Sequence, residues 1–179
     1  MHPEDEGPPE DAGGSDEGPD AVRRATDVCL KLLSMRARSR HELDAALTRK
    51  GFTAKVRDEA LSRVQGWGYL DDARFAQERA ASLLRKGRLG PQAVLQRLEA
   101  HGLGEAAARE ALARATHVEA FDALAAARAV LEGKGLLGRP LSAKERARAG
   151  RLLDSRGFSE DVVHRLLGEP SLDPSGPDE

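Results

Sequence analysis

The segment Gly133-Lys134-Gly135-Leu136-Leu137-Gly138 matches G-x-G-x-x-G, the pattern with which dinucleotide-binding proteins hold a pyrophosphate. That chemistry requires a β-strand directly before the first glycine and a helix directly after the last one. Here the preceding residues have helical periodicity, and Arg139-Pro140 follows. We therefore interpret residues 133–138 as a flexible linker between the second and third of three helical repeats in this chain.

The metal-ligating and nucleophilic side chains form no recognisable site. No two histidines are spaced i,i+4, and the single cysteine, Cys29, has no histidine beside it. Asp71 and Asp72 stand together, but adjacent acids at a predicted helix start are typical of N-caps. We expect no metal, no cofactor, no small-molecule substrate and no catalytic residue, so an enzyme is the weakest hypothesis.

Charge is strongly segregated along the chain, although the formal net charge is only −2. Residues 1–20 hold eight acids and residues 169–179 hold four, without a Lys or Arg in either segment. The remaining 18 acids face all 28 bases, so residues 21–168 carry a net charge of about +10. A basic body favours a nucleic acid, or an assembly that carries one, as partner. An Arg-rich solvated surface is the alternative, because Arg is also a good helix former.

Four aromatic residues crowd one part of the chain and could stack on unpaired bases: Phe52, Trp67, Tyr69 and Phe75. Each also stands at a turn or on an apolar helical face, where hydrophobic packing is the commoner role. We expect these aromatics in the core, with Tyr69 the best candidate for exposure.

A helical pattern that recurs three times must position these residues. The copies align on Gly51, Gly102 and Gly157, and each predicts a helix, a glycine turn in the left-handed conformation and a second helix. Apolar residues stand eight and four positions before each glycine and five and ten after it: Leu43, Leu47, Val56 and Leu61; Val94, Leu98, Ala107 and Leu112; Ala149, Leu153, Val162 and Leu167. Repeats of about 50 residues that bury their faces against neighbours predict an elongated array.

Periodicity and cap residues predict nine helices and no strand, so the fold class is all-α. Ser39 and Glu42 form an S-x-x-E capping box before the second helix. The helices are expected at about 21–35, 40–51, 54–65, from Asp71 or Asp72 toward Gly87, 91–101, 105–115, 118–132, 142–156 and 159–167.

Five segments follow: a disordered acidic leader (1–20), three helical repeats (21–70, 71–116 and 117–168) and a disordered acidic tail (169–179). The leader lacks the basic and apolar regions of a signal peptide, and no apolar run approaches the length of a membrane span. A single cysteine fits a reducing compartment. We expect a cytoplasmic protein that does not enter a membrane.

Several motifs resemble the RecX regulatory proteins of bacteria in order and spacing. They are Arg36-Ala37-Arg38-Ser39 with Glu42-Leu43, Arg49-Lys50-Gly51-Phe52, Gly68-Tyr69-Leu70-Asp71-Asp72-Ala73-Arg74-Phe75-Ala76, Arg85-Lys86-Gly87-Arg88-Leu89-Gly90-Pro91 and Arg156-Gly157-Phe158. His101 departs from the pattern, because the family usually has Lys before this glycine. The resemblance spans residues 21–168. It implies a crescent of three-helix repeats that binds the RecA recombinase filament on single-stranded DNA and damps its ATP hydrolysis, strand exchange and co-protease action. Such a protein regulates recombination, DNA repair and the SOS response and has no catalytic centre.

Nine cations in these motifs are the predicted contacts to the filament and to its DNA phosphates: Arg36, Arg38, Arg40, Arg49, Lys50, Arg74, Arg85, Lys86 and Arg88. Arg74 has an internal alternative, a pair with Asp71. Two other functions stay open: a sequence-indifferent nucleic-acid-binding helical protein that coats DNA, and a helical adaptor for an unrelated partner.

Overall fold

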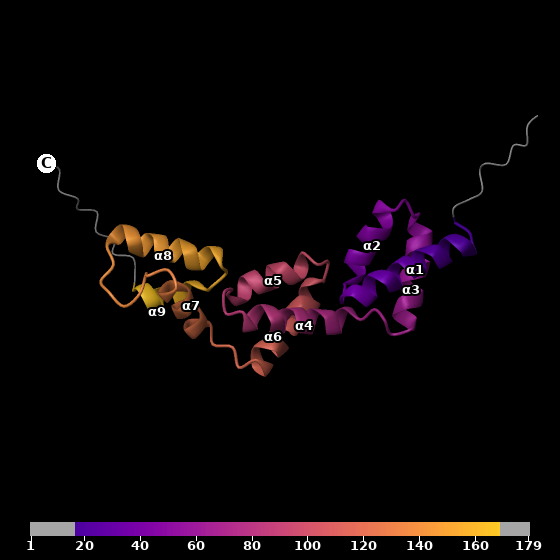
Figure 1. Ribbon diagram of the computed structural model, residues 1–179. Helices are drawn as coiled ribbons and strands as arrows, with labels where there is room; N and C mark the ends of the chain where they lie inside the picture. The colour runs from indigo at the N-terminus through magenta and orange to yellow at the C-terminus, as the bar shows by residue number, and fades with distance from the viewer. Residues whose placement is uncertain (1–16, 169–179) are drawn as a thin grey trace, which may run out of the picture. The chain divides into compact units, whose positions relative to one another are not determined.

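The computed structural model describes residues 17–168, and within this range the chain forms nine α-helices and no β-strand (Figure 1). This confirms the all-α prediction; the predicted leader and tail lie outside these residues, except for residues 17–20. The helices are α1 (Pro19–Met35), α2 (Arg40–Arg49), α3 (Ala54–Gly66), α4 (Asp72–Arg85), α5 (Pro91–Glu99), α6 (Glu105–Val118), α7 (Ala123–Glu132), α8 (Ala143–Ser155) and α9 (Glu160–Leu167).

The chain divides into two compact units, and the first ends at Asp71. It contains α1, α2 and α3, each of which packs against the other two (Figure 1). Leu43, Leu47, Val56 and Leu61 lie in its core and are at most 2% exposed, as the repeat pattern predicts. Burying a side chain of this size contributes about 1.5–3 kcal/mol, so this apolar face determines how the three helices pack.

The predicted capping box starts α2. The backbone N–H of Glu42 donates to Ser39 Oγ at 3.2 Å, and the N–H of Ser39 donates to the Glu42 carboxylate at 3.2 Å. Two donors that the helix leaves unpaired are thereby satisfied. The same S-x-x-E pattern recurs before α8, where Ser142 and Glu145 form a second capping box.

The three repeat glycines adopt the predicted left-handed conformation, with φ of +83° at Gly51, +78° at Gly102 and +74° at Gly157. In the first turn the N–H of Phe52 donates to the Leu47 carbonyl at 3.2 Å, and Phe158 N–H donates to Leu153 O in the same way at 3.1 Å. These bonds close the ends of α2 and α8. The helix–glycine–helix prediction is confirmed in all three copies.

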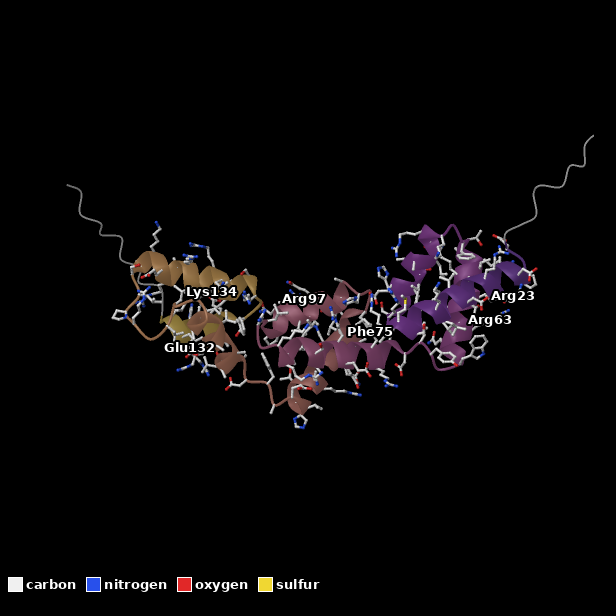
Figure 2. The ribbon with its side chains drawn as sticks, in the orientation of Figure 1. Arg23, Arg63, Phe75, Arg97, Glu132 and Lys134 are labelled. Atoms are coloured by element: carbon white, nitrogen blue, oxygen red, sulfur yellow. The ribbon has the colours of Figure 1, made fainter. Side chains whose placement is uncertain are left out.

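The second unit begins at Asp72 and contains two apolar clusters, one among α4, α5 and α6 and one among α7, α8 and α9. Phe75, labelled in Figure 2, is 7% exposed and belongs to the first of these clusters. The His101 ring contacts it edge-on, with centroids 5.4 Å apart. This packing gives His101 a structural role at the position where it departs from the family pattern.

A backbone contact between two glycines joins the α4–α5 turn to the α8–α9 turn inside the second unit. Gly90 N–H donates to Arg156 O at 2.8 Å, and Gln92 N–H donates to Gly157 O at 3.2 Å. A Cβ on Gly90 would lie 2.2 Å from Gly157 O, and a Cβ on Gly157 would lie 2.2 Å from the backbone nitrogen of Ala93. Only glycine fits at both positions.

The predicted start of the seventh helix at about residue 118 is wrong. Helix α6 continues to Val118, the chain turns at Ala120 with φ +47°, and α7 begins at Ala123. Asp122 is the N-cap of α7, because its carboxylate accepts from Leu124 N–H at 2.8 Å and from Ala125 N–H at 3.1 Å.

The prediction that residues 133–138 form a linker between the second and third helical repeats is also wrong. The segment connects α7 to α8, two helices of the same three-helix cluster. Leu136 is 7% exposed in that cluster, and its N–H donates to Leu131 O at 2.9 Å. The segment is therefore a helix-ending turn with an apolar anchor.

Two expected core residues are exposed. Trp67 is 57% exposed and Tyr69 is 62% exposed. Of the two, Tyr69 is the residue named as the best candidate for exposure. Gly68 turns the chain with φ +77°, so that Leu70 enters the core at 4% exposure in place of the aromatic rings. In α6, Ala107 is exposed and the next residue, Ala108, is buried.

Candidate functional site

Arg36 lies directly after α1 and holds the capping box of α2. Its guanidinium donates to both carboxylate oxygens of Glu42, at 2.7 and 3.2 Å, and to the Ala37 carbonyl at 2.9 Å. The hydrogen bond to Glu42 raises the pKa of Arg36. A bidentate pair of this kind fixes the side chain, so Arg36 stabilises the turn between α1 and α2.

Arg40 links α2 to α3. Its guanidinium donates to Asp58 at 2.6 Å and to the Gln65 side-chain oxygen at 3.1 Å. The remaining candidates of this unit differ: Arg38 donates to the Leu32 carbonyl at 3.3 Å, whereas Arg49 and Lys50 are exposed at the end of α2. Neither Arg49 nor Lys50 has an ion pair with a residue in the described range.

In the second unit, Arg74 and Arg85 are ion-paired. Arg74 lies one helical turn from Glu78 and donates to its carboxylate at 2.8 Å. Arg85, at the end of α4, pairs at 2.9 Å with Glu119, which follows α6. The Arg74–Glu78 pair is exposed and contributes about 0–1 kcal/mol, whereas the Glu119 side chain is only 18% exposed.

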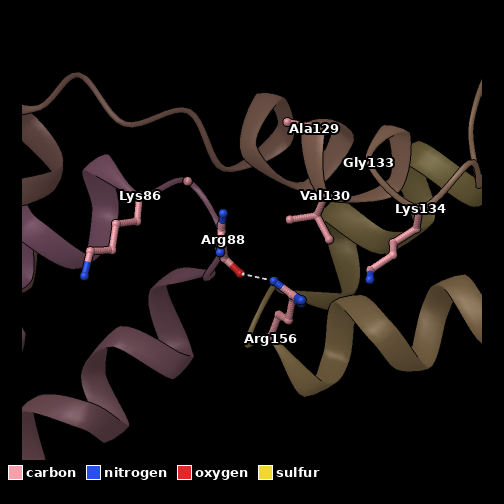
Figure 3. Close-up of a pocket in the computed structure, with 8 residues that line it drawn as sticks. Lys86, Arg88, Ala129, Val130, Gly133, Lys134 and Arg156 are labelled. Carbon is pink, nitrogen blue, oxygen red and sulfur yellow. Dashed lines mark hydrogen bonds between the residues drawn. The ribbon is translucent and has the colours of Figure 1, made fainter.

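Lys86 and Arg88 lie on the turn between α4 and α5 and line a pocket of about 460 Å³ (Figure 3). Lys134 and Arg156, from the turns after α7 and α8, line the same pocket. Arg156 donates to the Arg88 carbonyl at 3.1 Å, which ties one wall to the other. The structure thus brings two predicted cations together with two that the sequence prediction omitted.

A sequence signal existed for both omitted residues. Arg156 stands directly before its repeat glycine, the position that Lys50 holds in the first repeat. Lys134 lies within the G-x-G-x-x-G segment, which belongs to a packed repeat and is not a linker.

The described residues that line the pocket with Lys86 and Arg88 are four cations, two glycines and two small apolar residues, a composition suited to an anion. Between residues 17 and 168 no cluster of three His, Cys, Asp or Glu side chains could hold a metal ion. No helix in that range combines the length and apolar composition that crossing a bilayer requires.

Comparison with known proteins defines the family. Residues 25–63 match the model of the first three-helix domain of RecX, and residues 71–112 match that of the second. The chain is 35% identical over 151 residues to the regulatory protein RecX of Ectopseudomonas mendocina (strain ymp), which covers 84% of this chain and 95% of the relative. This chain belongs to the RecX family. It is also 34% identical over 153 residues to the regulatory protein RecX of Halorhodospira halophila, with 86% and 88% of the two chains covered.

Solved structures agree on the fold. The crystal structure of RecX from Lactobacillus salivarius matches with a TM-score of 0.68 at 18% identity, over 86% of this chain and 98% of the other. A second RecX crystal structure matches with a TM-score of 0.69 at 21% identity, over 84% and 74%. All nine predicted cations lie inside the two matched RecX segments, whereas Lys134 and Arg156 lie outside them.

Proposed function

We propose that this RecX family member binds the filament that the RecA recombinase forms on single-stranded DNA and lowers RecA activity. ATP hydrolysis, strand exchange and co-protease action would all fall, and recombination, DNA repair and the SOS response would be restrained. The protein acts in the cytoplasm as a regulator without a catalytic centre of its own. The observation that carries the proposal is the alignment, over most of both chains, with a relative named a regulatory protein.

The cations support a nucleic-acid partner within that assembly. Of the nine candidates, five have no ion pair with any residue between 17 and 168: Arg38, Arg49, Lys50, Lys86 and Arg88. A cation without a protein counter-charge gains most from a phosphate, because no existing pair has to break. The excess of bases in residues 21–168 acts in the same direction.

Co-sedimentation tests the proposal directly. RecA filaments assembled on single-stranded DNA should carry the protein into the pellet at a RecA concentration that leaves no free DNA. The double variant Arg49→Ala/Lys50→Ala should bind less tightly than the wild type, and its salt slope should be smaller by about 0.7 for each phosphate that the variant no longer neutralises.

The matched control is Arg23→Ala/Arg63→Ala, which removes two charges from the same unit (Figure 2). Both control arginines are ion-paired on their own helix, with Asp20 and Glu59. The control should bind as the wild type does. Failure of the wild-type protein to pellet with the filament would overturn the proposal, and equal weakening in both variants would overturn the role of Arg49 and Lys50.

A further inference from the structure

The pocket between the α4–α5 turn and the turns after α7 and α8 has the composition of a phosphate site. Lys86, Arg88, Lys134 and Arg156 contribute four positive side chains, and the other described residues that line it are Gly87, Ala129, Val130 and Gly133. No acid lines it. Four like charges gathered without a counter-charge repel one another, and a bound anion would remove that repulsion.

A second pocket of the same unit, next to the first, is lined by acids as well as by a cation. It has a volume of about 340 Å³, shares Gly87 and contains Arg85 together with Glu119 and Asp122. Arg85 and Glu119 are paired at 2.9 Å. Two acids thus line the pocket that contains Arg85, whereas the described lining of the pocket with Lys86 and Arg88 includes none.

Backbone contacts hold the turns that carry the four cations, and no acid in the described range neutralises the four side chains. Arg156 is held through its bond to the Arg88 carbonyl, and the adjoining glycines are in backbone contact. None of the four side chains has an ion pair with a residue in the described range. In Figure 3, Lys86 and Lys134 lie at opposite sides of the pocket, with Arg88 and Arg156 between them.

This arrangement fits successive phosphates of a strand better than a free nucleotide. Within the described part of the chain, Ala129 and Val130 are the only side chains in the lining besides the cations, so this lining offers no aromatic ring to stack on a base. Cations spread across an open pocket match charges repeated along a backbone.

We propose that this pocket binds the phosphodiester backbone of single-stranded nucleic acid, with Lys86, Arg88, Lys134 and Arg156 as its contacts. The proposal deepens the proposed function, on which it rests for the presence of DNA, and it makes the third helical repeat part of the DNA contact. Lys134 and Arg156 are the new members of that surface.

The test measures binding of the full-length protein to a fluorescein-labelled oligothymidylate by anisotropy, without RecA, over a series of salt concentrations. Lys86→Ala/Lys134→Ala removes two pocket charges. Lys144→Ala/Arg151→Ala removes two charges from exposed positions on α8, and neither residue has an ion pair within the described range. Thermal unfolding of each variant establishes that it is folded.

The pocket variant should bind on the order of 10-fold more weakly at low salt, and its log–log salt slope should shrink by about 1.4, corresponding to two phosphates. The α8 variant should be weakened much less. Equal weakening in the two variants, or none in either, would overturn the proposal. Displacement of the oligonucleotide by ATP in the wild type but not in the pocket variant would assign the pocket to a nucleotide instead and would also overturn it.

Failure here is distinguishable from failure of the proposed function. Co-sedimentation of the wild-type protein with RecA filaments tests the regulator, whatever the pocket variant does. A wild-type protein that pellets with the filament but binds no oligothymidylate would overturn the pocket proposal and leave filament binding standing.

Discussion

The glycine contact between the α4–α5 turn and the α8–α9 turn gives a prediction whose magnitude follows from the structure. Three glycines there differ in what an alanine would meet. Gly87 has φ +59° and nothing within 4 Å of an added Cβ. Gly90 has an ordinary φ of −80° but would place its Cβ 2.2 Å from Gly157 O. Gly157 combines φ +74° with a Cβ 2.2 Å from the Ala93 nitrogen.

Compared with one another, the three substitutions therefore separate the two sources of strain. Gly87→Ala should destabilise the unit by about 1–2 kcal/mol, the cost of a left-handed residue with a side chain. Gly90→Ala should cost about 1–3 kcal/mol or more, because a backbone oxygen can move only if the turn moves. Gly157→Ala combines both sources of strain and should cost about 2–5 kcal/mol. The double variant of Gly90 and Gly157 should cost less than the sum, because one displacement relieves both clashes.

Urea unfolding followed by two probes measures these differences. Far-ultraviolet circular dichroism reports the helices of both units, whereas fluorescence of Trp67, the only tryptophan, reports the first unit. The junction variants should lower the midpoint of the second unit in the dichroism signal and leave the fluorescence transition unchanged. If Gly157→Ala cost no more than Gly87→Ala, the two turns would not be in backbone contact and the description of the junction would be wrong.

Three further predictions concern single side chains. The hydrogen bond from Arg139 lowers the pKa of Glu145 from 4.5 to about 2, so the stabilisation is present above pH 4.5 and is lost as the pH falls toward 2. Unfolding midpoints over that range should fall more steeply for the wild type than for Glu145→Gln; parallel curves would refute the pairing. Burial raises the pKa of Cys29 to about 11, so a thiol reagent at pH 8 should react slowly with the folded protein and rapidly in urea, and equal rates would contradict the buried position. Trp67 should show the emission of a water-exposed indole and ready quenching by acrylamide, whereas a shielded ring would contradict its 57% exposure.

The sequence was most informative where a local rule has a single structural solution. Ser39 and Glu42 predicted a capping box because the motif satisfies two donors within four residues. Gly51 and Gly157 predicted helix ends because a left-handed residue strongly favours glycine. The buried leucines followed from their spacing to those glycines, and these features together define the all-α fold.

Prediction failed where a local pattern had two structural solutions. An exposed turn and a packed turn can both contain Trp67, and the outcome depended on Leu70 entering the core instead. The G-x-G-x-x-G segment lacked the context of a nucleotide site, but sequence alone did not reveal that Leu136 anchors it inside a repeat.

The candidate site shows the same limit in its charges. The local density of positive charge and the matching motifs predicted nine cations. Neither distinguishes Arg36 and Arg40, which are paired with acids, from Arg49 and Lys50, which have no ion pair within the described range. It also could not find the approach of Arg156 to Arg88, because that contact joins residues 68 positions apart through two glycine turns. Partners of this kind depend on tertiary packing, which a local pattern does not contain.

The central claim is that this protein acts on the RecA filament, and RecA ATP hydrolysis on single-stranded DNA tests it most directly. RecA from the same organism is titrated with the protein, first at a fixed DNA concentration and then with excess DNA at constant RecA. Inhibition at well below one molecule per RecA, maintained in excess DNA, is the predicted result. Absence of inhibition, or inhibition that added DNA abolishes, would contradict the claim and leave a protein that only coats nucleic acid or serves another partner.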